Sequence, residues 1–249
     1  MRSFPRRRVW LVAIVAGILL LGLGITAQRA AIGTGKPVAL FTSLPIIWTE
    51  QAGVRDMLAS TGSAHWARAV IERRGRIVAL DTLVGQSGLG LSAYDRAIIA
   101  QPRPLAPEEN VALDNWVRNG GRLLMFADPL LTGESAFAIG DRRRPQDVVL
   151  LSPILARWGL ELRFDDAQPS GERESAGEGL LVNLPGHFAA LPGGHDARCD
   201  LGEGALVARC RIGKGRAVIV ADAALLENFG DPGARIDQFE SLLDEAIGR

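Results

Sequence analysis

An uncharged, strongly apolar stretch near the amino terminus constrains this chain more than any other feature. Residues 9–27 contain no charged side chain. In lipid, a helix satisfies its own backbone hydrogen bonds, and one of this length would span roughly 28 Å, close to the thickness of the bilayer core. The stretch therefore predicts a transmembrane anchor at residues 9–27.

The charges around this stretch predict its orientation. Residues 1–8 carry four arginines and no acid, and cationic flanks resist translocation. We expect a basic cytoplasmic tail at 1–8, a linker at 28–36 and an extracytoplasmic α/β domain at 37–249. This makes a single-pass protein of the inner (cytoplasmic) membrane, in contact with membrane lipid through its helix. The alternative is a cleaved signal peptide ending near Ile25-Thr26-Ala27. Both interpretations export the domain.

Short apolar runs that alternate with helical patterns predict the fold of the exported part. Buried strands are expected at 37–41, 76–80, 96–100 and 122–127, and helices at 54–58, 65–73 and 108–118. Strands that are apolar along their whole length indicate a mostly parallel sheet with helices on both faces. Later segments predict a helix at 152–158, strands at 160–164, 180–182, 205–212 and 217–220, and a closing helix at 236–247. Their glycine-rich turns predict an antiparallel hairpin elaboration near 197–220.

The composition argues against nucleic-acid binding. The chain has 28 basic and 28 acidic residues, so removing the four arginines of the tail leaves an excess of acids. Non-specific nucleic-acid binding depends on clustered Lys and Arg. The run Arg142-Arg143-Arg144 lies in a predicted loop, 130–146, and is interpreted as a solvated charge run.

Polar residues follow four of the predicted strands directly, and they form the candidate ligand or partner edge. Thr42 and Ser43 follow the first strand, and Asp81, Asp128 and Asp222 follow later ones. In an open parallel sheet these residues would gather at the carboxyl edge, where α/β folds bind ligands. The alternative is that each aspartate caps the turn that follows its strand.

The standard catalytic and metal signatures are missing from the sequence. It contains no GxxxxGK[ST] and no GxSxG motif, and we predict no catalytic residue, cofactor or metal site. His187 and His195 share a Pro- and Gly-rich segment with Asp196, which is read as an ordinary loop. His65 is expected to be a surface or capping residue at the start of a helix.

The two cysteines form a candidate disulfide. Cys199 and Cys210 both lie in the exported part, where thiols can oxidise. Two buried thiols are the alternative. A turn centred on Gly202-Glu203-Gly204 would not place the two sulfurs directly opposite each other, so a disulfide is expected to need a β-bulge.

Two segments resemble a known family. Residues 105–124 (LAPEENVALDNWVRNGGRLL) and 213–222 (GKGRAVIVAD), with Asn228-Phe229 after them, resemble the GldG-like auxiliary proteins of ABC-type transport systems. The resemblance implies a flavodoxin-like domain of the class I glutamine amidotransferase-like superfamily, non-catalytic and tethered near an ABC permease. The reactive cysteine of true amidotransferases has no counterpart, because Asp128-Pro129 follows the strand where it would be sought.

Two functions remain as expectations. The first is a membrane-anchored, extracytoplasmic, non-catalytic binding or scaffolding component, whose partners would be an ABC-transporter permease or other envelope proteins. The second is an anchored hydrolase or carbohydrate-active enzyme that uses the strand-end aspartates. The second requires at least two of Asp81, Asp128 and Asp222 to share a concave pocket within about 10 Å.

Overall fold

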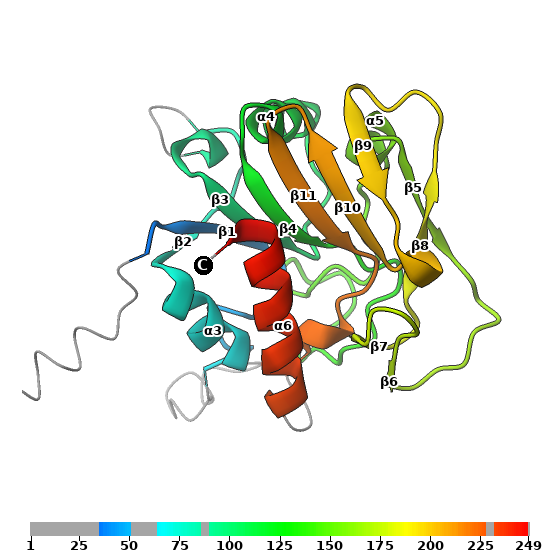
Figure 1. The fold of residues 1–249 in the computed structure, drawn as a ribbon. Coiled ribbons are helices and arrows are strands. Elements are labelled where there is room, and N and C mark those ends of the chain that lie inside the picture. The colour runs from blue at the N-terminus through cyan, green and yellow to red at the C-terminus, as the bar shows by residue number, and fades with distance from the viewer. Residues whose placement is uncertain (1–34, 51–63, 86–89, 228–231, 249) are drawn as a thin grey trace, which may run out of the picture.

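A seven-stranded sheet forms the centre of the part of the chain that the structure, a computed structural model, describes: residues 35–50, 64–85, 90–227 and 232–248. Its strand order is β2-β1-β3-β4-β11-β10-β9 (Figure 1). The bounds are β1 Val38–Thr42, β2 Ile77–Ala79, β3 Arg96–Ala100, β4 Arg122–Phe126, β9 Ala197–Asp200, β10 Val207–Ile212 and β11 Gly215–Val220.

The first five strands in this order run parallel, whereas β10 pairs antiparallel with β11 and β9 pairs antiparallel with β10. The central strands are buried along almost their whole length; all five residues of β3 are buried, as are Leu123 to Phe126 in β4. This is the burial expected of a sheet covered on both faces. The prediction of a mostly parallel α/β fold is confirmed.

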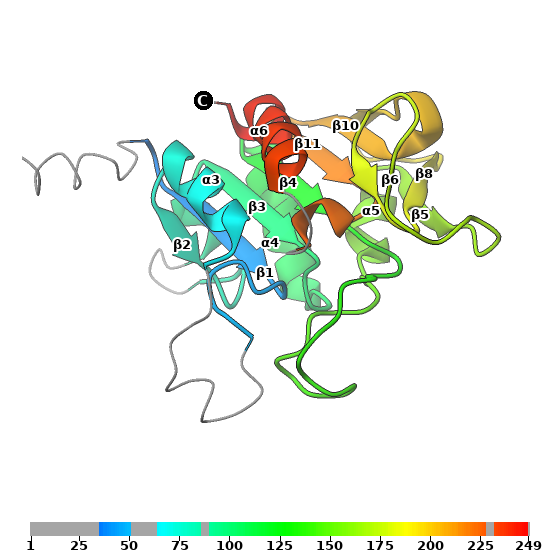
Figure 2. The same ribbon diagram turned by 90° about the horizontal axis from the view of Figure 1, so that it is seen from below.

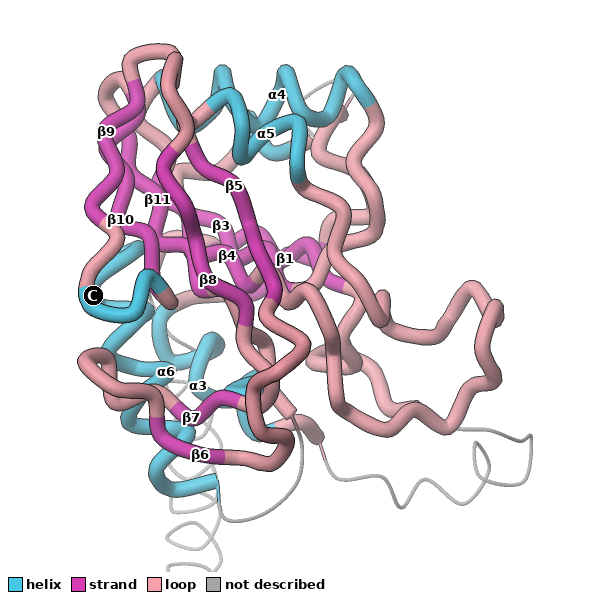
Figure 3. Tube along the Cα trace, turned by 90° about the vertical axis from the view of Figure 1, so that its right-hand side faces the viewer, coloured by secondary structure: helices cyan, strands magenta, loops and turns pink. Residues whose placement is uncertain are grey.

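Helices lie on both faces of the sheet (Figure 2). The helices α3, Trp66–Arg74, and α6, Pro232–Ile247, pack together on one face, and α6 contacts β4 and β11. The helix α4, Pro107–Arg118, covers the other face with α5, Ser152–Arg157, beside it (Figure 3). Short 3-10 turns occur at Leu91–Ala93, Glu203–Ala205 and Ala224–Leu226.

Two small antiparallel sheets stand beside the central one. β5, Leu160–Phe164, pairs with β8, Gly186–Ala190, and β6, Arg173–Glu174, pairs with β7, Leu181–Val182. The interpretation of the His187 segment as a loop is therefore wrong: His187 belongs to β8 and lies opposite Arg163. Its short run, GHFAA, lacks the β-branched residues that mark strands in a sequence.

The two segments that carry the family resemblance contact each other. They meet where the end of α4 lies against the β10–β11 turn: Lys214 N donates to Arg118 O at 2.9 Å, and Arg216 N to Gly121 O at 3.1 Å. A Cβ on Gly215 would lie 2.0 Å from Val117 O. Only glycine fits this crossing.

Several predicted features fall on residues that the structure does not describe. The anchor 9–27, the tail 1–8, most of the linker 28–36, the helix 54–58 and Asn228-Phe229 all lie outside the described residues. Within the described ranges, no helix combines the length and hydropathy that crossing a bilayer requires.

Candidate functional site

The parallel strands bring all five predicted edge residues to the carboxyl end of the sheet, but in two different settings. Thr42, Ser43 and Asp81 line an open pocket at the ends of β1 and β2. Asp128 and Asp222 lie in the interior, with exposed fractions of 0% and 1%. The structure therefore does not bring Asp81 into one pocket with the other two aspartates.

Each oxygen of Asp128 accepts a backbone N–H. Leu130 N donates to Oδ1 at 2.8 Å, and Ala223 N donates to Oδ2 at 3.0 Å. The first bond closes the turn that follows β4, and the second joins this turn to the segment after β11. Asp128 thus caps its own turn and ties two neighbouring strand ends together.

Asp222 follows the same pattern at the end of β11. Ala224 N donates to its Oδ1 at 2.5 Å, and Asn183 N donates to its Oδ2 at 3.0 Å. Burial raises the pKa of Asp128 to about 7, with a smaller effect of the Glu227 charge. Burial also raises the pKa of Asp222 well above its ordinary value, and the nearby charge of Asp128 adds to this shift. Both carboxyls are placed to stabilise the edge from inside.

Gln101, which the sequence reasoning missed, organises the middle of the edge. It follows β3 directly, is fully buried and has a φ of +43°. Its Oε1 accepts from Asp128 N at 2.9 Å, and its Nε2 donates to Asp128 O and Gln146 O at 3.1 and 2.8 Å. Ser43 Oγ donates to Gln101 O at 2.5 Å and accepts from Gln146 N at 3.0 Å. The position of Gln101 directly after β3 is the sequence signal that could have identified it, and it shares this signal with the strand-end aspartates.

The open pocket, here called the arginine pocket, has a volume of about 500 Å³. Four arginines line it, and three of them form ion pairs with carboxylates: Arg103 with Glu109, Arg143 with Asp141 and Arg144 with Asp147. Arg142 is exposed. Aromatic rings and small polar groups complete the wall: Phe41, Trp48, Phe137, Thr42, Ser43, Thr49, Asp81 and Gln146.

The arginine run therefore is not simply a solvated charge run. The Arg143 guanidinium lies 4.2 Å from the centre of the Phe137 ring, and Arg144 donates to Phe137 O at 2.9 Å. The side chain of Arg144 is only 20% exposed. These contacts fold the loop back over the pocket, which a sequence pattern of three adjacent charges does not reveal.

Glu109 holds the far wall of the arginine pocket. It receives both terminal nitrogens of Arg103 at 2.7 and 2.8 Å, Thr82 Oγ1 at 2.8 Å, and the amides of Leu83 and Ala106. These donors, led by Arg103, outweigh the effect of burial and lower its pKa to about 2. Glu109 is the acid three residues into α4, so the predicted acidic start of this helix also anchors the pocket.

A second pocket of about 480 Å³ lies next to the first and is here called the glutamate pocket. It is lined by Glu50, Glu134 and Glu227, with His65 and Thr132. Glu227 Oε1 accepts from Thr132 Oγ1 at 2.9 Å, whereas its Oε2 is buried without a hydrogen-bond partner among the described residues. Burial raises the pKa of Glu227, which favours a neutral carboxyl.

His65 is the N-cap of α3, as one of the sequence interpretations expected, but it is buried rather than on the surface. Its Nδ1 accepts from Ala67 N at 3.1 Å, so Nε2 carries the proton and donates to Leu226 O at 2.9 Å. Burial lowers its pKa. Both ring nitrogens are thus used: Nδ1 caps α3, and Nε2 joins it to the segment that leads to Glu227.

The sulfurs of Cys199 and Cys210 are bonded in the structure. The two residues are direct partners across β9 and β10, so the expected bulge is not needed. The loop from 201 to 206, with its 3-10 turn, absorbs the offset that a tight turn on Gly202-Glu203-Gly204 would have imposed. In the described part of the chain, no three His, Cys, Asp or Glu side chains gather as metal ligands would.

Comparisons with known proteins give only distant similarities. No protein-family model matches the chain, and a comparison with curated protein sequences gave no match. Among solved structures, the chain is similar to an exo-β-1,4-mannosidase from Opitutaceae bacterium strain TAV5, with a TM-score of 0.48 and 18% identity over 88% of this chain and 37% of that one.

Two smaller proteins are also similar. A cytoplasmic protein from Salmonella typhimurium has a TM-score of 0.45 at 13% identity, covering 85% of this chain and 99% of that one. A ThuA-like protein from Bacteroides uniformis has a TM-score of 0.41 at 12% identity, covering 86% and 90%. The chain spans about a third of the glycoside hydrolases that it matches. At these scores, no inference about function rests on the likeness.

Proposed function

We propose that this chain is a membrane-anchored, extracytoplasmic binding component that takes a small polar ligand, or a side chain of a partner, in the arginine pocket. The observation that carries the proposal is the contrast at the carboxyl edge. The acids that chemistry would need, Asp128 and Asp222, are sealed by backbone amides, whereas the pocket beside them is open and combines aromatic rings with fixed polar groups. Such a lining is typical of recognition sites.

The position of the pocket supports the same proposal. In the order β2-β1-β3, the chain reverses its direction of growth between β1 and β3, and ligands of open α/β sheets bind at such switch points. Thr42 and Ser43 at the end of β1 line the pocket. The order β2-β1-β3-β4-β11, with helices on both faces, supports a flavodoxin-like domain of the class I glutamine amidotransferase-like type.

The proposed partner class rests on the resemblance. The two segments that are similar to GldG-like auxiliary proteins pack against each other, at Lys214 and Arg118 and at Arg216 and Gly121. They therefore form one structural unit, which supports a non-catalytic role beside an ABC-type permease or another envelope protein. The arginine pocket would then receive a group of that partner or of its cargo.

Ligand titration tests the pocket. Trp48 is 41% exposed on the pocket wall, so a bound ring should change its fluorescence. We expect one member of a panel of neutral monosaccharides and dicarboxylates to bind the full-length chain in mild detergent. Isothermal titration calorimetry measures the variants, because Trp48→Ala removes the fluorescent reporter. Binding should weaken at least fivefold in Trp48→Ala and should be unchanged in Ile139→Ala, an exposed apolar residue outside the pocket lining. A panel without a binder, together with unchanged co-purification of membrane partners in Trp48→Ala, would refute the pocket as the binding site.

A reporter fusion tests the placement of the domain. Fusing alkaline phosphatase after residue 249 should give activity, because the domain is proposed to lie outside the cytoplasm, and a fluorescent protein that folds only in the cytoplasm should stay dark. The reverse pattern would refute the extracytoplasmic role and leave the pocket to be judged by the titration alone.

One observation favours the alternative, an anchored hydrolase. Glu227 lines the glutamate pocket, and its raised pKa favours the protonated form that a general acid needs. If the chain hydrolyses glycosides, Glu227→Gln should abolish turnover while leaving the melting temperature within a few degrees. Turnover that survives this change would exclude Glu227 as the acid.

A further inference from the structure

Five arginines lie side by side across the sheet at the end opposite the two pockets. Arg96 in β3 pairs with Arg122 in β4, Arg122 with Arg216 in β11, Arg216 with Arg211 in β10, and Arg211 with Arg198 in β9. Directly paired residues on neighbouring strands project from the same face. With strands about 4.8 Å apart, this arginine row is roughly 19 Å long.

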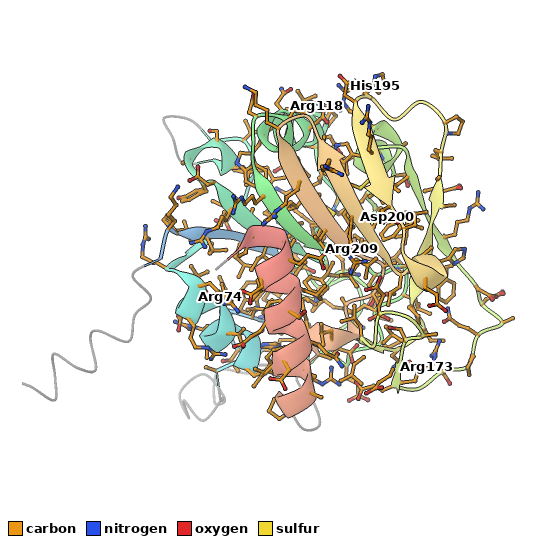
Figure 4. All side chains as sticks on the ribbon, viewed as in Figure 1. Arg74, Arg118, Arg173, His195, Asp200 and Arg209 are labelled. Carbon is orange, nitrogen blue, oxygen red and sulfur yellow. A yellow bond between two sulfur atoms is a disulfide. The ribbon has the colours of Figure 1, made fainter. Side chains whose placement is uncertain are left out.

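The row projects from the face that carries α6. Arg216 Nε donates to Ala246 O at 2.7 Å, and Arg122 reaches Ile247 O at 3.5 Å, both at the carboxyl end of α6. Arg209, two residues before Arg211 on β10, also points to this helix and binds its Glu245 (Figure 4). Three members of the row, Arg122, Arg211 and Arg198, are exposed.

The charge of the row is only partly compensated by side chains: Asp95 interacts electrostatically with Arg96, and Glu245 with Arg216, without an ion pair. Among the described residues, none of the five arginines forms an ion pair with a carboxylate. The nearest acids are engaged elsewhere: Asp95 pairs with Lys36, and Glu245 with Arg209. Arg96 is buried, with an exposed fraction of 6%, and its Nε has no hydrogen-bond partner among the described residues.

Such a row is costly unless something outside the domain binds it. Like charges directly opposite each other in a sheet are destabilising. Hydrogen bonds to the carbonyl groups at the end of α6 offset this repulsion only in part. The arrangement repeats over four adjacent strand pairs. A planar anionic surface can meet all the exposed members at once, which a small anion cannot.

The path of the chain indicates which surface this is. Arg96 donates to Lys36 O, so one end of the row touches the point where the chain enters the domain. The linker between the apolar segment and the described domain, residues 28–34, reaches at most about 25 Å when extended. We infer that the arginine row docks the domain on the anionic phospholipid headgroups of the membrane that holds the anchor; this inference rests on the anchor of the proposed function.

The experiment compares lipid surfaces with the full-length chain. Reconstituted into nanodiscs of phosphatidylglycerol and phosphatidylcholine, or of phosphatidylcholine alone, the chain should show slower hydrogen exchange over β9 and the β10–β11 turn only in the anionic discs. About 0.5 M salt should abolish the difference, because it screens exposed charges beyond a few ångströms. Added inorganic phosphate separates the two sources of the same chemistry: protection in neutral discs with phosphate alone would overturn the lipid assignment.

Variants make the test specific. Arg211→Glu and Arg198→Glu remove exposed members of the row and should each reduce the lipid-dependent protection, whereas Arg142→Glu, an exposed arginine at the opposite end of the sheet, should leave it unchanged. Each arginine lost should weaken binding to anionic vesicles roughly fivefold. Equal exchange in both kinds of disc would refute the docking surface.

The failure of the anchor gives a different result. A chain without an anchor would not enter either kind of disc and would remain soluble. The row still predicts salt-sensitive co-sedimentation of that soluble chain with phosphatidylglycerol vesicles, roughly fivefold weaker for the neutral variant Arg211→Gln and weaker still for Arg211→Glu. The absence of co-sedimentation would refute the row independently of the anchor.

Discussion

Removing the link between Cys199 and Cys210 is the most direct test of how the antiparallel end of the sheet is held. The two residues are separated by 11 positions and pair directly across β9 and β10. Closing a loop of this length removes unfolded-state entropy worth about 3 kcal/mol. Because β9 is the edge strand and pairs only with β10, no other strand holds it in place.

We therefore expect Cys199→Ser with Cys210→Ser to lower the free energy of unfolding by about 3 kcal/mol, or the melting temperature by roughly 6 to 12 °C. Thermal unfolding of the full-length chain in detergent, followed by circular dichroism with and without reductant, measures this. Reductant should lower the melting temperature of the wild type to that of the double variant, and it should not change the double variant, which serves as its control.

Two free thiols in the non-reduced wild type, with a melting temperature that ignores reductant, would refute the reasoning. That outcome would also weaken the proposal that the domain matures in an oxidising compartment, where disulfides form and persist. The edge strand β9 would then be held by backbone pairing alone.

The remaining predictions concern the carboxyl edge and the motif crossing. Burial raises the pKa of Asp128 from 3.8 to about 7, so the native state keeps a proton that the unfolded state has lost. Stability should then fall as pH rises between these values, by up to about 4 kcal/mol, and Asp128→Asn should flatten that dependence in denaturant titrations at pH 5 and 8; parallel curves would contradict it. The pH dependence of stability from Glu109 has the opposite sign, since the pKa of Glu109 is lowered from 4.5 to about 2. Its contribution is present above pH 4.5 and lost as pH falls towards 2, so Glu109→Gln should cost about 2 kcal/mol at pH 7 and little near pH 2; an equal cost at both would show that its charge is unimportant. Gly215→Ala places a Cβ 2.0 Å from Val117 O and should lower the free energy of unfolding by about 2 kcal/mol or more, measured by chemical denaturation. The control Gly140→Ala meets no atom within 4 Å and should lower it by about 1 kcal/mol, because Gly140 has a φ of +88°. Similar losses of stability in the two variants would argue against the crossing.

The sequence by itself determined which segments form the parallel strands of the central sheet. Runs such as 97–100 and 123–127 are apolar at every position, and only a strand covered on both faces buries such a run completely. The same reasoning located α4, because its proline, its acids and the glycines that end it are local signals of helix boundaries. It also placed Thr42, Ser43, Asp81, Asp128 and Asp222 at one edge, since parallel strands end together.

Segments without a local signal were not predictable. β8 and β9 are short and lack β-branched runs, and they form only because β5 and β10 offer them partners. Pairing between distant strands depends on tertiary contacts that override weak propensity. For the same reason the offset between Cys199 and Cys210 could not be read from the position of the glycine turn.

Only the tertiary structure decided what the edge residues do. In the sequence Asp81 and Asp128 look alike, each following a strand, yet one lines a pocket and the other is enclosed by backbone amides. Burial and hydrogen bonding depend on which loops fold over the edge, and a neighbouring strand or loop is distant in sequence. The arginine row shows the same limit: each arginine lies near an end of a different strand, and only the register of five strands brings them into line.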